Sequence, residues 1–227
     1  MTDTVSPPPL PPVPDGVTRA SEEGGFYHEA ALNATWTGVR LAAGSLSFAF
    51  GCFVFAYFYL RSLNSHGMWY PPGFKGPQAW AGALIMALVV LSAVVQHVGL
   101  ARIKASRKRD WQTSAVAALA LGLAAIGLQV WQLMNLPFQP GRAGFASVFV
   151  GATPVFLIVA LGAMIWLETL IMRVRVIPQI SFVEQPPTYA EAFAVQRFQS
   201  ALSAFTLLWN YLAVVAVVFW VLFYLTA

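Results

Sequence analysis

Charged residues, cysteine and histidine are all scarce in this sequence of 227 residues. Asp, Glu, Lys and Arg make up only 10% of it, whereas a typical soluble domain carries about 25%. The single cysteine, Cys52, excludes an intrachain disulfide. The histidines His28, His66 and His97 never stand one helical turn apart, so the sequence predicts no haem or metal site made by this chain alone.

Motifs that carry chemistry are also missing. The sequence contains no phosphate-binding loop, no nucleophile with a paired base, and no acidic pair placed for general acid–base catalysis. Its net charge of +4 is small and clustered, which is typical of membrane orientation and not of nucleic-acid binding. We therefore expect neither a catalytic centre in this chain nor a nucleic-acid partner.

Apolar residues, by contrast, make up 58% of the chain and gather in long runs. A helix needs about 20 apolar residues to cross a hydrocarbon layer of about 30 Å, and lipid offers no other partner for the backbone amides. The sequence therefore predicts an all-α fold, an integral membrane bundle of five transmembrane helices. The predicted spans are Trp36–Leu60, Gln78–Leu100, Trp111–Met134, Phe145–Met172 and Ala201–Thr226.

The first 33 residues differ in kind from the rest of the chain. The run Ser6–Pro12 is mostly proline, which lacks the amide that a helix needs and favours an extended polyproline conformation. It has neither the basic start nor the apolar region of a signal peptide. We interpret residues 1–33 as a disordered, proline-rich cytoplasmic tail and residues 34–227 as a five-helix transmembrane domain. The alternative for the proline run is a ligand for a proline-recognising partner.

Basic residues predict the orientation of the bundle. With five crossings, the tail, the second loop and the fourth loop share one side of the membrane, and that side holds most of the lysines and arginines. Short loops rich in Lys and Arg stay in the cytoplasm, so we expect a cytoplasmic N-terminus and a C-terminus on the periplasmic, outer side. The cytoplasmic set is Arg19, Arg40, Arg102, Lys104, Arg107, Lys108, Arg109, Arg173, Arg175 and Arg197. The outer set is Arg61, Lys75 and Arg142.

One acidic residue, Glu168, lies inside a predicted span. A carboxylate in lipid is seldom accidental, and this one could accept a proton or bind a lipid amine. The alternative is an ion pair with Arg175, two turns along the same face of the helix. Near the boundary, His97 is expected to form interfacial hydrogen bonds. The basic run Lys104–Arg109 is expected to lie against anionic headgroups, with docking of a partner subunit as the alternative.

Three side-chain amides within the spans, Gln129, Gln132 and Asn210, are predicted to join helices by hydrogen bonds. Small residues let the backbones of neighbouring helices approach each other. We expect such close approach at Gly44, Gly51, Gly162 and the run Ala118–Ala125.

Four short segments stand in a distinctive order. Trp69–Gly73 reads Trp-Tyr-Pro-Pro-Gly after the first span, and Gln129–Gln132 reads Gln-Val-Trp-Gln near the end of the third. Phe145–Phe149 reads Phe-Ala-Ser-Val-Phe at the start of the fourth span, and Trp209–Tyr211 reads Trp-Asn-Tyr in the fifth. This order resembles subunit III of the haem–copper terminal oxidases, the cytochrome c oxidase family, in a divergent five-helix bacterial form. The corresponding family segments are Trp-Pro-Pro, Gln-x-x-Glu-Tyr, Tyr-Gly-Ser-x-Phe and Trp-His-Phe.

The resemblance covers the chain from Gly44 to Tyr224 and agrees with the predicted five helices. It departs from the family at every ionisable position inside the membrane, where this chain carries a neutral residue. Family roles that need those groups, such as assistance in proton uptake, are therefore not carried over. The neutral residues are Leu46 or a neighbour, Gln132, Phe156, Val159, Asn210 and a residue at about Ala213.

The resemblance implies a non-catalytic accessory subunit of a respiratory oxygen reductase in the bacterial inner membrane. Such a subunit holds no haem or copper itself. It packs against the catalytic subunit I, which carries the haem and copper, and belongs to a complex with subunit II. It also shields the proton entrance and binds phospholipid. The residues expected to contact lipid are Trp80, Arg102, Lys104 and Glu168.

Two alternatives remain at the level of sequence. The accessory subunit of a nitric oxide reductase system shares the five-helix core, and the sequence does not separate the two. A small membrane transporter is the alternative from a different class. It would be expected to show an internal repeat, broken helices or a buried charged pair, and the sequence shows no evident self-similarity.

Overall fold

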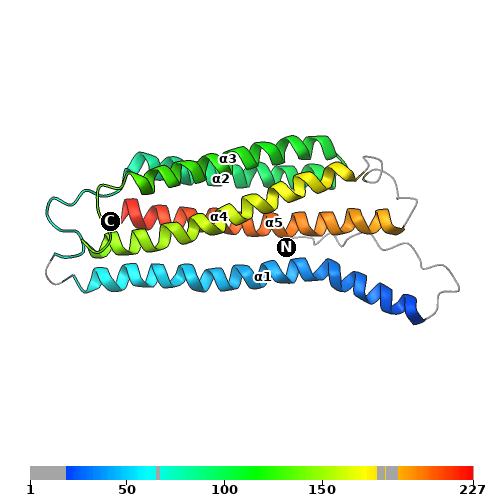
Figure 1. The fold of residues 1–227 in the computed structure, drawn as a ribbon, viewed down its shortest axis with the longest axis horizontal. Helices are drawn as coiled ribbons and strands as arrows, with labels where there is room; N and C mark the ends of the chain where they lie inside the picture. The colour runs from blue at the N-terminus through cyan, green and yellow to red at the C-terminus, as the bar shows by residue number, and fades with distance from the viewer. Residues whose placement is uncertain (1–18, 65–66, 178–181, 183–188, 227) are drawn as a thin grey trace.

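The computed structural model describes residues 19–64, 67–177, 182 and 189–226, and the described part of the chain is helical apart from its connections. Consecutive helices run in opposite directions along the bundle (Figure 1). The last helix continues without a break into a π-helical turn, η2. The helices are α1 (Arg19–Ser62), α2 (Ala79–Lys104), α3 (Lys108–Met134), α4 (Gly144–Val176) and α5 (Tyr189–Trp220), followed by η2 (Val221–Leu225).

Each of the five helices contains a stretch long and apolar enough to cross a membrane. The prediction of an all-α fold with five candidate spans is therefore confirmed. The stretches are Leu32–Ser62, Ala79–Lys104, Lys108–Met134, Gly144–Val176 and Phe193–Leu225.

Helices α1 and α5 begin well before their predicted spans. Helix α1 begins at Arg19, inside the segment interpreted as a tail, because no proline occurs between Pro14 and Pro71 and the chain after Arg19 is rich in Ala and Glu, which favour helix. Helix α5 begins at Tyr189, inside the predicted fourth loop and two residues after Pro187, the last proline of that loop. At 1.5 Å per residue the 44 residues of α1 extend about 66 Å, more than twice the hydrocarbon thickness. The proline run lies outside the described residues.

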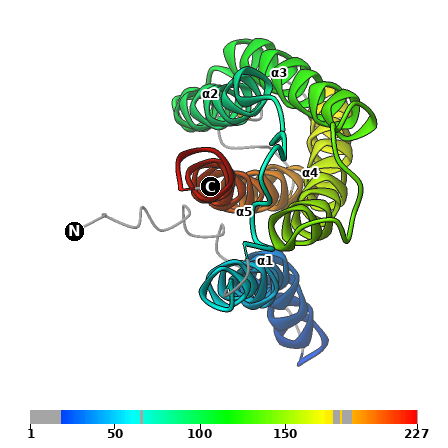
Figure 2. The ribbon, with the colours of Figure 1, turned by 90° about the vertical axis from the view of Figure 1, so that its left-hand side faces the viewer.

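Helix α5 is central in the bundle and α1 is peripheral. Figure 2 shows α5 between α1 on one side and α2 on the other, and α1 contacts mainly α4 and α5. Only 11% of the apolar window of α1 is buried, against 50% of that of α5. The first turns of α1 bend away from the other helices (Figure 1). One side of α1 therefore faces the surroundings along its whole span.

The loop after α1 closes one end of the bundle. The backbone amides of Gly144 and Phe145, at the start of α4, donate to the carbonyls of Met68 (3.2 Å) and Trp69 (3.3 Å). The indole of Trp69 packs edge-on against Tyr57 and Phe145, with centroid distances of 4.9 and 5.9 Å. A helix start leaves backbone amides without partners, so this loop caps α4. One of the two capping residues, Trp69, is the first residue of the Trp-Tyr-Pro-Pro-Gly segment.

Helices α2, α3 and α5 are joined at mid-bundle by buried hydrogen bonds. Ser92 Oγ donates to the carbonyl of Ala118 (2.7 Å), and Trp209 Nε1 donates to Ser92 Oγ (3.0 Å). Trp209 is fully buried. Nearby, Gly122 lies against the sulfur of Met164, with no room for a side chain of its own. The close packing predicted for Ala118–Ala125 is thus confirmed.

The same expectation is wrong for three other glycines. No atom of a neighbouring element lies within 4 Å of the position that a Cβ would occupy at Gly44, Gly51 or Gly162. These glycines lie on the outward sides of α1 and α4, where exposed apolar residues such as Phe48 and Ile158 are also found. Within this chain they allow no close helix contact.

Candidate functional site

Polar side chains gather at the end of the bundle where α2 begins and η2 ends. Gln132 Nε2 donates to the hydroxyl of Tyr224 (2.9 Å) and to the backbone carbonyl of Gln78 (3.1 Å). Gln129 Nε2 donates to Gln132 Oε1 (3.3 Å). Gln129 and Gln132, predicted from the sequence to join helices, thus lie in one network that connects α3 to the start of α2 and to η2. The ring of Tyr224 lies across Gly82.

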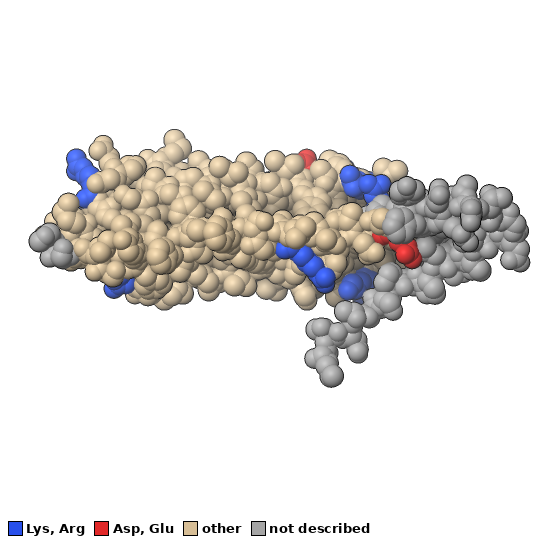
Figure 3. Space-filling model, turned by 90° about the horizontal axis from the view of Figure 1, so that it is seen from below, with Lys and Arg blue, Asp and Glu red and all other residues tan. Residues whose placement is uncertain are grey.

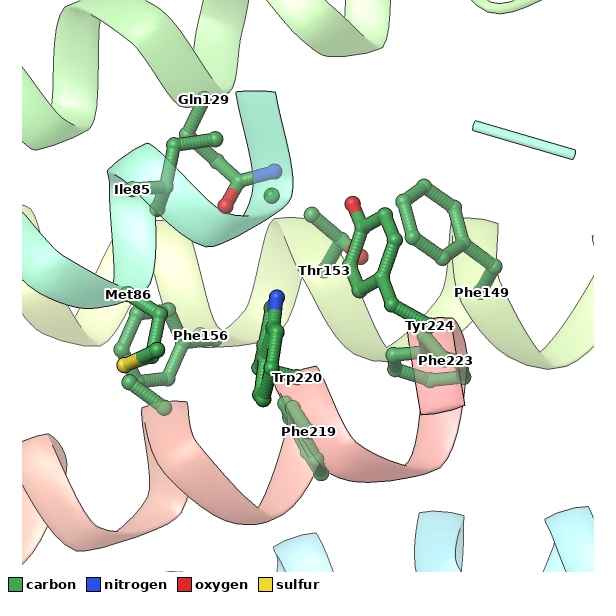
Figure 4. A pocket seen from close by; sticks show the side chains of 12 residues that line it. Ile85, Met86, Gln129, Phe149, Thr153, Phe156, Phe219, Trp220, Phe223 and Tyr224 are labelled. Atoms are coloured by element: carbon green, nitrogen blue, oxygen red, sulfur yellow. The ribbon is translucent and has the colours of Figure 1, made fainter. Parts of the chain in front are cut away.

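A small cavity of about 40 Å³ lies beside this network. Gln129, Thr153, Trp220 and Tyr224 come from four different elements and surround it (Figure 4). The indole nitrogen of Trp220 is buried and has no hydrogen-bond partner among the described residues. The space suits one or two water molecules and is far too small for a haem or an organic substrate, so we interpret it as a hydration site within the packing.

A second group of polar side chains lies on the outside of the bundle, where α5 is left uncovered between α1 and α2. Asn210 Nδ2 lies 3.3 Å from His97 Nδ1 of α2. On the opposite edge of the same helix, the hydroxyl of Tyr211 accepts a hydrogen bond from Ser47 Oγ of α1 (3.1 Å). His97 and Ser47 are exposed, and Asn210 and Tyr211 are half-buried.

An apolar stripe separates these two polar pairs. It consists of outward residues of α5 and the first residue of η2, of which Val214 is the most exposed at 62%. We call this surface the α5 face and define it by the two pairs and the stripe between them. The stripe is Leu207, Val214, Val217, Val218 and Val221.

The α5 face belongs to the candidate membrane span Phe193–Leu225. Asn210 stands 14 residues from Tyr224, about 21 Å along the helix at 1.5 Å per residue. If the hydrocarbon layer of about 30 Å begins near Tyr224, both pairs lie inside it. Polar side chains at such depth usually face the interior of a bundle, whereas here they face outward.

The outward side of α1 continues this uncovered surface. Phe48 and Phe55 are exposed at 79% and 69%, and Cys52 lies between them on the same side of the helix. The outward glycines Gly44 and Gly51 leave the backbone accessible between these side chains. Much of the surface seen in Figure 3 carries no charged side chain.

The residues predicted to contact lipid do not form one site. Trp80 and Arg102 lie 22 residues apart on α2, about 33 Å along the helix. Trp80 stacks at an angle against Trp131, with centroids 5.6 Å apart, whereas Arg102 donates to Ser114 Oγ (2.9 Å). Lys104 is exposed beyond Arg102, at the end of α2.

Glu168 is exposed on α4 and forms no ion pair with Arg175. In the part of the chain that the structure describes, the one ion pair joins Arg107 and Asp110, whose charged atoms lie 4.0 Å apart. The same part contains no group of three His, Cys, Asp or Glu residues placed to hold a metal ion. It therefore offers no buried charged pair and no metal centre.

One member of the basic run predicted to face headgroups points inward instead. Lys108 is 8% exposed, and its ammonium group donates to the backbone carbonyl of Ile177. Ile177 caps the C-terminus of α4, where helix carbonyls lack partners and a cation is favoured. Ser106 likewise donates to the carbonyl of Phe182 (2.5 Å). The connection between α2 and α3 thus holds the end of α4.

Several of these residues were not identified from the sequence. The sequence predicts that Asn210 joins helices, but its neighbours Tyr211 and Trp209 stand out only as part of a motif, and nothing in the sequence singles out Ser92, the partner of Trp209. Hydrogen bonding across helices depends on how the helices are rotated, which hydropathy does not report. A polar residue inside an apolar span is therefore the one signal that the sequence offers for such positions.

No protein-family model matches this chain, and no curated protein matches its sequence significantly. The resemblance to the oxidase subunit therefore rests on the four short sequence segments alone.

Proposed function

We propose that this chain is a non-catalytic accessory subunit of a respiratory haem–copper oxygen reductase of the cytochrome c oxidase type. It packs against the catalytic subunit I in the bacterial inner membrane, together with subunit II and bound phospholipid. Its N-terminus lies in the cytoplasm and its C-terminus on the periplasmic side. Haem and copper belong to the partner subunit.

The observation that carries the proposal is the α5 face. It presents Asn210 with His97, and Tyr211 with Ser47, at a depth where lipid tails offer no hydrogen bonds. The side chains satisfy each other only in part, because an imidazole and an amide carry further donors and acceptors. A partner helix that covers this face would complete their hydrogen bonds.

The outward side of α1 supports the same arrangement. Gly44 and Gly51 provide the smooth surface against which membrane helices pack closely, and none of the described residues packs against it. The aromatic side chains of Phe48 and Phe55 add area for contact beside the glycines. A membrane partner is therefore a better match for this surface than lipid alone.

The chain is proposed to act by rigid packing and by the low-dielectric surroundings that its apolar helices give the catalytic subunit. The buried bonds among Ser92, Trp209 and Ala118 hold α2, α3 and α5 as one body. Such a body provides a fixed surface for the catalytic subunit and keeps the region around its proton entrance stable. No proton step is assigned to this chain, since the family's ionisable positions are neutral here.

The nitric oxide reductase alternative uses the same surface and differs only in the partner. A transporter is less well supported. The broken helices or buried charged pair of a transporter are not found in the described residues, where α4 stays continuous through Pro154 and the one ion pair is exposed.

Purification of the tagged full chain from native membranes in a mild detergent tests the proposal. A reduced-minus-oxidised optical spectrum and mass spectrometry identify what accompanies it. We expect a haem-containing catalytic subunit in stoichiometric amount, with oxygen consumption by the complex. Nitric oxide consumption without oxygen consumption would favour the alternative partner, and a colourless, homogeneous five-helix protein would overturn the proposal.

A further inference from the structure

Helix α4 presents an uncovered line of side chains on the side of the bundle away from the α5 face. Figure 2 shows α4 on the right, whereas the uncovered side of α5, between α1 and α2, opens to the left. The line repeats at alternating spacings of three and four residues, and every member is exposed, Ile158 at 68%. We call this line the α4 seam and define it as Ile158, Leu161, Ile165, Glu168 and Met172.

This spacing is the one along which two helices pack at about 20° with interlocking side chains. Helix α1 packs on the same line further back along α4. Seven residues before Ile158, a Cβ at Gly151 would lie 3.3 Å from the ring of Phe53 of α1. From there α1 and α4 diverge toward the end of α4 (Figures 1 and 2). The seam therefore begins where α1 leaves α4, and no described helix takes the place of α1 along it.

Glu168 is the one ionisable member of the seam. It lies 24 residues after Gly144, where α4 begins, about 36 Å along the helix. A hydrocarbon layer of about 30 Å that begins near Gly144 ends just before Glu168, and Ile158 lies inside it. Glu168 is exposed and has no ion pair among the described residues, Arg175 included. A carboxylate at the edge of a low-dielectric layer is thus left without an opposite charge.

The charge of Glu168 indicates what covers the seam. Membrane helices carry Lys and Arg close to their cytoplasmic ends, and Glu168 lies toward the end of the bundle proposed to be cytoplasmic. A basic side chain at that level of a neighbouring helix would meet Glu168, while the apolar residues of that helix cover Ile158 and Ile165. A second copy of this chain in the same orientation would instead bring Glu168 against Glu168, and like charges repel.

We propose that the α4 seam binds a transmembrane helix of a second partner protein, with a Lys or Arg of that helix paired to Glu168. Ile158, Leu161 and Ile165 interlock with apolar side chains of the same helix. The catalytic subunit is assigned to the α5 face, on the other side of the bundle, so both partners bind at once. The inference therefore goes beyond the proposed function and does not depend on it.

Förster transfer between the purified full chain and synthetic transmembrane peptides in phosphatidylcholine vesicles tests the site. The donor dye is attached to Cys52, the single cysteine, which is exposed on α1. The peptides are apolar helices of about 20 residues that carry the acceptor dye and differ in one residue near one end, which is Lys, Gln or Glu. We expect the Lys peptide to bind about five- to tenfold more tightly than the Gln peptide, which corresponds to roughly 1–1.4 kcal/mol for a polar contact between membrane helices.

Exchanging the charges gives the sharpest result. Glu168→Gln should abolish the preference for the Lys peptide, and Glu168→Lys should reverse it in favour of the Glu peptide. Glu168 is exposed, so neither change disturbs the core, and an unchanged circular dichroism spectrum checks this. Ile165→Ala should weaken binding of the Lys peptide, whereas Leu123→Ala, at a similarly exposed position on α3, should not.

Three results would contradict the proposal. Equal binding of the Lys and Gln peptides by the unchanged chain, or equal loss in Ile165→Ala and Leu123→Ala, would each overturn it. Transfer between two labelled copies of the chain that Ile165→Ala abolishes would also overturn it, since the seam would then belong to a second copy. The assay contains no catalytic subunit, so its failure leaves the proposed function standing, and the reverse also holds.

Discussion

The side-chain amide of Asn210 in α5 lies 3.3 Å from Nδ1 of His97 in α2, on a surface that the other described helices leave uncovered. The amide N–H donates to the ring when the imidazole carries its proton on Nε2. The second ring nitrogen and the amide oxygen then remain for another molecule. The pair thus joins α2 to α5 and also leaves hydrogen-bonding groups for the proposed partner subunit.

Replacing the amide by an apolar side chain of similar size should separate folding from association. We predict that Asn210→Leu leaves the thermal midpoint of the isolated chain in detergent nearly unchanged, because the pair is largely exposed there. The amount of catalytic subunit that co-purifies should fall about three- to tenfold, since interhelical hydrogen bonds in membranes contribute roughly 0.6–1.5 kcal/mol. Val218→Leu, an apolar exchange on the same face, serves as the control. Unchanged co-purification in Asn210→Leu would show that no partner uses the pair.

Tyr224 and Gly82 give a second prediction, on stability. The ring of Tyr224 occupies the place of a side chain at position 82, and its hydroxyl is held by Gln132. We predict that Gly82→Ala lowers the free energy of unfolding by about 1–3 kcal/mol, the usual range for overpacking. Unfolding of the purified chain by a denaturing detergent, followed by circular dichroism, measures this.

Two other glycines calibrate that result. Gly44→Ala should be neutral or slightly stabilising, because nothing lies within 4 Å and alanine favours helix. Gly122→Ala should cost less than Gly82→Ala, since the flexible side chain of Met164 can move aside while Tyr224 is anchored. An equal loss of stability in all three variants would mean that the Tyr224 contact is not what limits position 82.

The hydrogen bond from Trp209 to Ser92 gives a third prediction. The bond is 3.0 Å long, buried, and far from water at mid-bundle. A double-mutant cycle with Trp209→Phe and Ser92→Ala should give a coupling energy of about 0.5–1.5 kcal/mol. The cycle removes the separate effects of the smaller ring and of the lost bond from Ser92 to Ala118. A coupling energy near zero would mean that apolar packing alone, without this hydrogen bond, makes the bundle rigid.

The five spans could be predicted because their signal is local. A run of about 20 apolar residues has few alternatives to a membrane helix, so length and composition were enough. The ends were less certain, because water satisfies backbone amides outside the membrane and a helix can extend there without an apolar sequence. Helix α1 accordingly starts at Arg19 and α5 at Tyr189, both within segments expected to be tail or loop.

The details of packing could not be read in the same way. Gly122 and Gly44 look alike in the sequence, yet one lies against Met164 and the other faces outward. Lys108 belongs to a basic run, but it reaches the end of α4 because the connection to α3 turns it inward. Both results depend on how each helix is rotated toward its neighbours, and side chains far apart in the sequence decide that rotation.

Site-directed cross-linking tests the central claim most directly. Cys52 is the single cysteine, so Cys52→Ala provides a background for one new cysteine at Val214, on the α5 face, or at Leu123, exposed on α3. Each variant is labelled with a photoactivatable maleimide in native membranes and irradiated. We predict a cross-link from position 214 to a haem-containing catalytic subunit and none from position 123. Cross-links to lipid alone from both positions, or to the catalytic subunit only from position 123, would contradict the account.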